Sequence, residues 1–131
     1  MTKRESLLRA QSLAKSGVLY APVSFMLASI AQLEEICNGC GAADSWFRPP
    51  ASIWGTCIIY ACHIHDWMYN EGVDDEDKQV ADRSMKHNMQ RLIRRDAHKW
   101  YKPTKLQYAR SILYYEAVVN YGGPAFWAGK N

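Results

Sequence analysis

Two ionisable side chains of this sequence fall on helical faces that are otherwise apolar. His65 lies on one side of a predicted helix together with Tyr69, and Asp82 lies on one side of the next helix. The apolar residues in register are Ile58 and Cys62 for His65, and Met85, Met89 and Leu92 for Asp82. A carboxylate that faces a protein core costs free energy unless it is paired or hydrogen-bonded. Asp82 therefore needs a buried partner.

The two helices are joined by a short turn, so we expect them to pack antiparallel. This packing would bring Asp82, early on the second helix, beside His65 and Tyr69, late on the first. A His–Asp pair oriented by a tyrosine hydroxyl is typical of general-base catalysis. The periodicity alone leaves a structural interpretation open, in which His65 is a hydrogen-bonded core residue and Asp82 caps the helix start.

Asp66 follows His65 directly and points about 100° away from it on a helix. The segment 38–43 contains Gly39 and Gly41 and would form a loop facing this carboxylate. Calcium takes carboxylate and backbone carbonyl oxygens as ligands, and small residues let the backbone approach an ion closely. The pattern therefore predicts a calcium site between Asp66 and the loop.

The elements that position these residues are predicted to be helices. We expect helices over 1–16, 24–36, 52–69 and 106–119, and an ordered loop at 38–50. A further helix would begin at the acidic turn 71–77, carry Leu92, and end before Pro103 resets the chain. The glycines that follow residue 121 would end the last helix. There is little sign of strands. The sequence therefore predicts an all-α fold whose two central helices are antiparallel, with additional helices at both ends.

Length and composition fit one globular domain over residues 1–131. Aromatic residues make up 12% of the chain and the net charge is only +3, which argues against disorder. We find no repeat, no stretch long and apolar enough to span a membrane, and no clear secretory signal peptide. We therefore expect an intracellular location or export by a non-standard route.

The segment from Ala61 to Tyr69, ACHIHDWMY, resembles the active-site helix of phospholipase A2, whose pattern is Cys-Cys-x-x-His-Asp-x-Cys-Tyr. Ala61 and Met68 stand where that family has two of its cysteines. The segment 38–41, Asn-Gly-Cys-Gly, resembles the Gly-Cys-Gly core of the calcium loop in many bacterial members. The segment 81–83 is similar to the one that carries the family's catalytic Asp. The resemblance covers less than half of the chain.

This resemblance implies a role for each matching residue. It implies a calcium-dependent hydrolase that acts on the sn-2 ester of glycerophospholipids at a membrane or micelle surface, with no obligate protein partner. The implied site comprises His65 as general base, Asp82 and Tyr69 as its supports, Asp66 and the carbonyls of Gly39, Gly41 and Ala43 as calcium ligands, and the Gly41 N–H as oxyanion donor. It also implies a Cys40–Cys62 disulfide. Cys37 and Cys57 match nothing in the family pattern.

Two other classes of function compete with this interpretation. The four cysteines Cys37, Cys40, Cys57 and Cys62 resemble a zinc ligand set, although the second pair has an i, i+5 spacing that places its sulfurs on different sides of a helix. The segment 83–110 holds nine Lys or Arg and one acid with interleaved aromatic residues, which would suit nucleic acid or an anionic lipid surface. We expect nucleic acid to be the less favoured partner.

Overall fold

The structure, a computed structural model, describes residues 1–40 and 51–130. It is 69% helix and 3% strand, so the all-α class is confirmed. The helices are α1 (Lys3–Lys15), α2 (Val23–Leu27), α3 (Ile30–Ile36), α4 (Ile59–Glu71), α5 (Asp75–Asp96), α6 (Thr104–Tyr121) and α7 (Gly123–Trp127), and the strands are β1 (Ser52–Ile53) and β2 (Thr56–Cys57).

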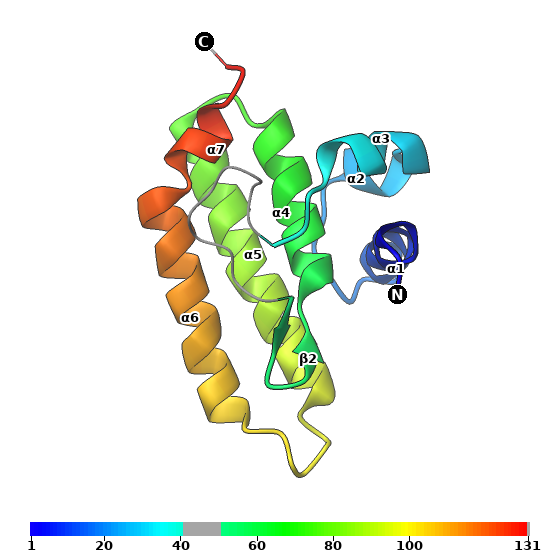
Figure 1. Cartoon of the computed structure of the whole chain (residues 1–131), viewed down its shortest axis with the longest axis vertical. Helices are drawn as coiled ribbons and strands as arrows, with labels where there is room; N and C mark the ends of the chain where they lie inside the picture. The colour runs from blue at the N-terminus through cyan, green and yellow to red at the C-terminus, as the bar shows by residue number, and fades with distance from the viewer. Residues whose placement is uncertain (41–50, 131) are drawn as a thin grey trace.

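Helix α5 is the centre of the arrangement, with α4 on one side and α6 on the other (Figure 1). Helix α1 packs against the opposite side of α4, and the short helices α2 and α3 lie beside it. The core between α1, α4 and α5 contains the buried residues Leu7, Ala10, Ile64, Met85 and Met89. The two central helices that were expected to pack antiparallel correspond to α4 and α5.

The helix expected over 24–36 is two helices, because the chain is extended at Ala28 and Ser29. Ser29 begins α3 with a capping box: its side chain accepts from the Gln32 backbone N–H at 3.2 Å, and the Gln32 side chain accepts from the Ser29 N–H at 2.9 Å. The Gln11 amide of α1 donates to the carbonyls of Phe25 and Ala28 at 2.9 Å. These hydrogen bonds satisfy backbone N–H and carbonyl groups at the break between α2 and α3.

The helix expected from Ser52 begins only at Ile59. The residues before it form a β-hairpin, in which Ile53 pairs with Thr56 across a two-residue turn. Both turn residues, Trp54 and Gly55, have positive φ, as tight hairpins require. The sequence interpretation missed this hairpin because its strands have two residues each, too few to show an alternating pattern.

The acidic turn starts α5 as expected. The Asp74 side chain accepts a hydrogen bond from the Asp77 backbone N–H at 2.8 Å, and three further acids occupy the first turn, where the helix dipole favours negative charge. Helix α5 carries Leu92, as expected, and ends at Asp96. Within the described part of the chain, no helix combines the length and the apolar composition that a membrane span needs.

Candidate active site

Three of the predicted site residues meet between α4 and α5. The His65 Nε2 lies 2.8 Å from Asp82 Oδ1, and the Tyr69 hydroxyl donates to the same oxygen at 2.6 Å. His65 is 7% exposed and Asp82 is 1% exposed, so the pair is enclosed in the core. The short turn between the helices places the end of α4 against the start of α5. The contact predicted from the spacing is therefore present, while the catalytic roles stay a prediction.

Lys78 is a partner of Asp82 that the sequence interpretation missed. Its Nζ donates to Asp82 Oδ2 at 2.8 Å and to the Val118 carbonyl near the end of α6 at 2.9 Å. The spacing of four residues between Lys78 and Asp82 is a signal that could have revealed the ion pair. The α6 carbonyl could not be foreseen, because it lies 40 residues away in the chain.

These contacts set the charge states of the cluster. Burial would raise the pKa of Asp82, but the hydrogen bonds from His65, Lys78 and Tyr69 outweigh burial and lower it. Burial and the nearby Asp82 charge raise the pKa of Tyr69, so its hydroxyl remains a donor. An ionised Asp82 can only accept a hydrogen bond, so the His65 nitrogen that faces it, Nε2, carries the hydrogen. The basic nitrogen of a neutral His65 is then Nδ1.

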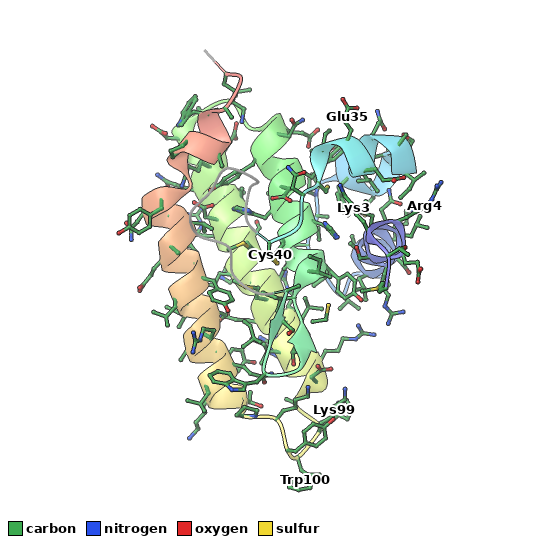
Figure 2. The ribbon with its side chains drawn as sticks, viewed as in Figure 1. Lys3, Arg4, Glu35, Cys40, Lys99 and Trp100 are labelled. Carbon is green, nitrogen blue, oxygen red and sulfur yellow. A yellow bond between two sulfur atoms is a disulfide. The ribbon has the colours of Figure 1, made fainter. Side chains whose placement is uncertain are left out.

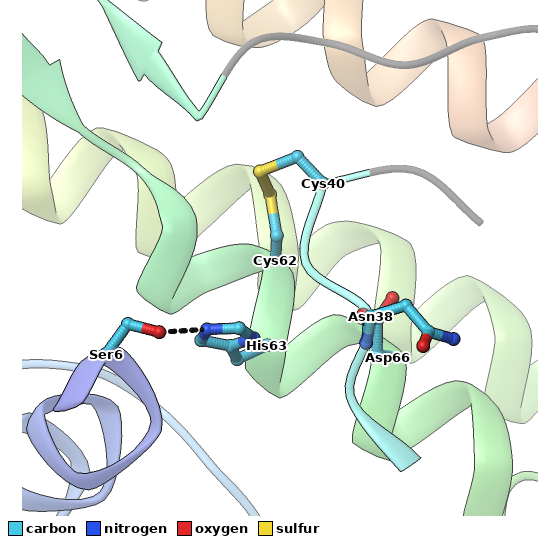
Figure 3. The surroundings of a disulfide bond; sticks show 6 residues. All are labelled: Ser6, Asn38, Cys40, Cys62, His63 and Asp66. Carbon is cyan, nitrogen blue, oxygen red and sulfur yellow. Dashed lines mark hydrogen bonds between the residues drawn. A yellow bond between two sulfur atoms is a disulfide. The ribbon is translucent and has the colours of Figure 1, made fainter. Parts of the chain in front are cut away.

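Asp66 faces the start of the predicted calcium loop (Figure 3). The Asn38 backbone N–H donates to Asp66 Oδ2 at 2.7 Å. Burial raises the pKa of Asp66 to about 7, and the N–H groups of Asn38 and Gly39 act in the opposite direction. Gly39 has a φ of +87°, and a Cβ there would lie 3.1 Å from the Ile59 side chain, so glycine suits this position.

The predicted ligands Gly41 and Ala43, and the predicted oxyanion donor Gly41, lie outside the described residues. Among the described residues, no Lys or Arg forms an ion pair with Asp66. The described part of the chain also contains no cluster of three or more His, Cys, Asp or Glu side chains able to hold a metal.

The disulfide Cys40–Cys62 is present, as the resemblance implied. It ties the start of the loop to α4, one turn before Asp66, with a Cα–Cα separation of 4.9 Å (Figure 3). Two of the four thiols proposed for zinc are thus joined to each other. Cys37 is buried, its thiol donates to the His63 carbonyl at 3.3 Å, and burial raises its pKa to about 12. The four-thiolate zinc set is therefore not assembled in this structure.

A second buried histidine, His63, lies on the α1 side of α4. Its Nε2 is 2.8 Å from the Ser6 hydroxyl (Figure 3). The same hydroxyl donates to the Lys3 carbonyl at 2.8 Å. Its Nδ1 has no hydrogen-bond partner among the described residues. Burial lowers the pKa of His63 to about 4. His63 is therefore a neutral structural histidine, and sequence reasoning could not identify Ser6 as its partner.

Comparison of the chain with protein-family models, with curated proteins and with solved structures found no match. Function is therefore inferred from the residues that meet between α4 and α5.

Proposed function

We propose that this chain is a calcium-dependent hydrolase of the phospholipase A2 type, which cleaves the sn-2 ester of glycerophospholipids. One observation carries the proposal: Asp82 Oδ1 accepts hydrogen bonds from both His65 and Tyr69 inside the α4–α5 pair. Asp66, next to the base in sequence, points to a disulfide-anchored loop instead of to that cluster. A histidine paired with a carboxylate and a second, separate carboxylate are thus adjacent residues of one helix, which supports the proposal.

In the proposed reaction, His65 Nδ1 removes a proton from a water molecule as the water oxygen bonds to the ester carbonyl carbon. Asp82 stabilises the imidazolium that forms, and Tyr69 keeps the carboxylate oriented toward His65. The bond from the carbonyl carbon to the sn-2 oxygen then breaks, and the imidazolium returns its proton to that oxygen. The products are a fatty acid and a lysophospholipid.

The residues near the loop fit calcium by their chemistry. Asp66 has no cationic side chain as an ion-pair partner in the described part of the chain, and the loop backbone lies close to it, since the N–H groups of Asn38 and Gly39 bond its carboxylate. Asp66 and the carbonyl of Gly39 would bind the ion, together with the expected carbonyls of Gly41 and Ala43. When bound, calcium would supply positive charge for the substrate phosphate and would polarise the ester carbonyl.

The experiment that tests the proposal is release of a labelled fatty acid from the sn-2 position of phosphatidylcholine in mixed micelles. We expect release with calcium, none in excess chelator, and a loss of at least about 100-fold for His65→Gln, since general-base catalysis contributes that much. His98→Gln is the matched control, because His98 is exposed and its Nδ1 lies 2.9 Å from the Arg95 carbonyl of its own turn. Equal release by both variants, or release in chelator, would refute the proposal.

A further inference from the structure

The end of the molecule where α5 leads into α6 carries exposed aromatic and basic side chains, which we call the aromatic–basic tip. It combines the β1–β2 turn with the α5–α6 connection. Its members are Trp54, Arg94, Trp100, Tyr101, Lys105 and Arg110. Trp100 is 93% exposed and Tyr101 is 62% exposed. Figure 2 shows Trp100 extending from the ribbon at the end opposite the C-terminus.

The two halves of the tip are held together by specific contacts. The Gln107 amide of α6 donates to the Ile53 carbonyl at 2.9 Å and to the Thr56 hydroxyl at 2.8 Å. The Arg110 guanidinium lies 5.3 Å from the centre of the Trp54 ring, and Trp100 and Tyr101 pack edge to face at 6.1 Å. The rings therefore belong to an ordered surface.

Trp54 occupies a backbone position that disfavours it. Its φ is +43°, and it is the one non-glycine residue of the described part of the chain with positive φ. A two-residue hairpin turn of this kind favours Asn, Asp or Gly at both positions, and positive φ is costly for a bulky residue. The ring is nevertheless 48% exposed, so burial in the core does not account for it. Strain retained at an exposed residue indicates a role for the side chain.

The charge of the tip is strongly positive. Residues 94–110 contain six Lys or Arg and a single acid, Asp96, which gives 6 − 1 = +5. That acid is already engaged, since it accepts from the Thr56 hydroxyl at 2.8 Å and lies 3.6 Å from Lys99 Nζ. The exposed cations Arg94 and Lys105 form no ion pair within the described residues.

We propose that the aromatic–basic tip binds the surface of a bilayer that contains anionic phospholipids. Trp and Tyr are favoured at the boundary between water and lipid, and each Lys or Arg near an anionic surface adds to binding. The tip lies about 21 Å along α5 from Asp82, at 1.5 Å per residue over 14 residues. It therefore acts as a tether that holds the protein at the surface. This deepens the proposed function by naming the surface through which that activity meets its substrate.

The test measures co-sedimentation of the full chain with vesicles in excess chelator and low salt. One set contains phosphatidylcholine alone and the other an equal mixture of phosphatidylcholine and phosphatidylglycerol. We expect binding to the anionic set that weakens with added salt. The double variant Arg94→Gln/Lys105→Gln should lose about 25-fold in partition, since each cation contributes about fivefold. Trp54→Asn should also bind more weakly, although asparagine suits the turn and should keep or raise the melting temperature.

The matched control is Arg4→Gln/Lys15→Gln on α1, which removes the same charge from exposed positions and should keep the wild-type partition. His65→Gln should also bind as the wild type does. If the wild-type chain binds the anionic vesicles but releases no fatty acid from them once calcium replaces the chelator, the proposed function is overturned and the tether still stands. Three results would overturn the tether. One is an equal loss of vesicle partition in the tip and control variants, and another is no binding to anionic vesicles at all. The third is displacement of the chain from those vesicles by a single-stranded oligonucleotide.

Discussion

Two histidines of α4, His63 and His65, lie two residues apart on different sides of the same helix. Both are buried, with exposed fractions of 2% and 7%. His63 faces α1 and bonds the Ser6 hydroxyl, whereas His65 faces α5 and bonds the Asp82 carboxylate. The two share a helix and a degree of burial, and they differ in the chemistry of their partner.

That difference decides what each ring is able to do. A hydroxyl brings no negative charge, so burial dominates at His63 and its pKa falls to about 4. At His65 an ionised carboxylate is in place to stabilise an imidazolium as soon as one forms. Burial alone therefore makes a structural histidine, and a buried carboxylate is what suits a histidine for proton transfer.

Replacing Asp82 should have the largest effect, because it makes His65 resemble His63. In Asp82→Asn the amide brings no charge to stabilise an imidazolium and no longer fixes the tautomer of His65. We expect sn-2 hydrolysis to fall by about 10³- to 10⁴-fold, as for the supporting carboxylate of other His–Asp pairs. The measurement is fatty acid release under saturating calcium.

Asp75→Asn provides the control for this variant, since Asp75 is an exposed acid in the first turn of the same helix. Circular dichroism should show both variants folded. Wild-type hydrolysis in folded Asp82→Asn would mean that the carboxylate has no part in the chemistry.

His63 should affect the pH dependence of the free energy of unfolding rather than the rate of hydrolysis. Its pKa is about 4 in the folded protein against 6.5 for the ordinary group, so the unfolded chain binds a proton first as pH falls. The free energy of unfolding is therefore not reduced by His63 above pH 6.5. It falls as pH drops from 6.5 toward 4, by at most about 3 kcal/mol.

The measurement is urea unfolding of the wild type and of His63→Gln at several pH values. Asp66 has the opposite sign, because burial raises its pKa to about 7 and folding then favours its protonation as pH falls. The difference between wild type and variant removes this shared contribution. A difference in unfolding free energy that is constant from pH 7 to pH 4 would contradict the assignment of His63.

Lys78 should give the smallest effect. It bonds the second oxygen of Asp82 and a carbonyl of α6, so it orients the carboxylate without touching the base. Lys78→Met should lower kcat about tenfold and leave KM unchanged, the loss expected when one charge-assisted hydrogen bond is removed. Lys78→Arg should restore part of kcat. A rise in KM with kcat unchanged, or no rescue by arginine, would show that Lys78 does not position Asp82.

The features that depend on local spacing could be predicted from the sequence. Helical periodicity places His65, Tyr69 and Asp82 on facing sides of two antiparallel helices, and the resemblance to phospholipase A2 implied the Cys40–Cys62 disulfide. The Ser29–Gln32 capping pattern is also local and could have predicted the break between α2 and α3. These features need only a few neighbouring residues to be recognised.

The remaining features depend on contacts between distant segments. Ser6 reaches His63 across 57 residues, and the α6 carbonyls reach Lys78 across about 40. The hairpin at 52–57 has Trp-Gly in its turn, where Asn-Gly would have been the recognisable signal. Pattern recognition fails at such points because packing, rather than local preference, fixes the conformation.

The role of His65 as the general base is tested by comparing fatty acid release from sn-2-labelled phosphatidylcholine by His65→Gln and His63→Gln at neutral pH with calcium. The two variants make the same chemical change two residues apart on α4. We expect hydrolysis by His63→Gln close to that of the wild type and a loss of at least about 100-fold in His65→Gln. Equal hydrolysis by the two folded variants would contradict this role.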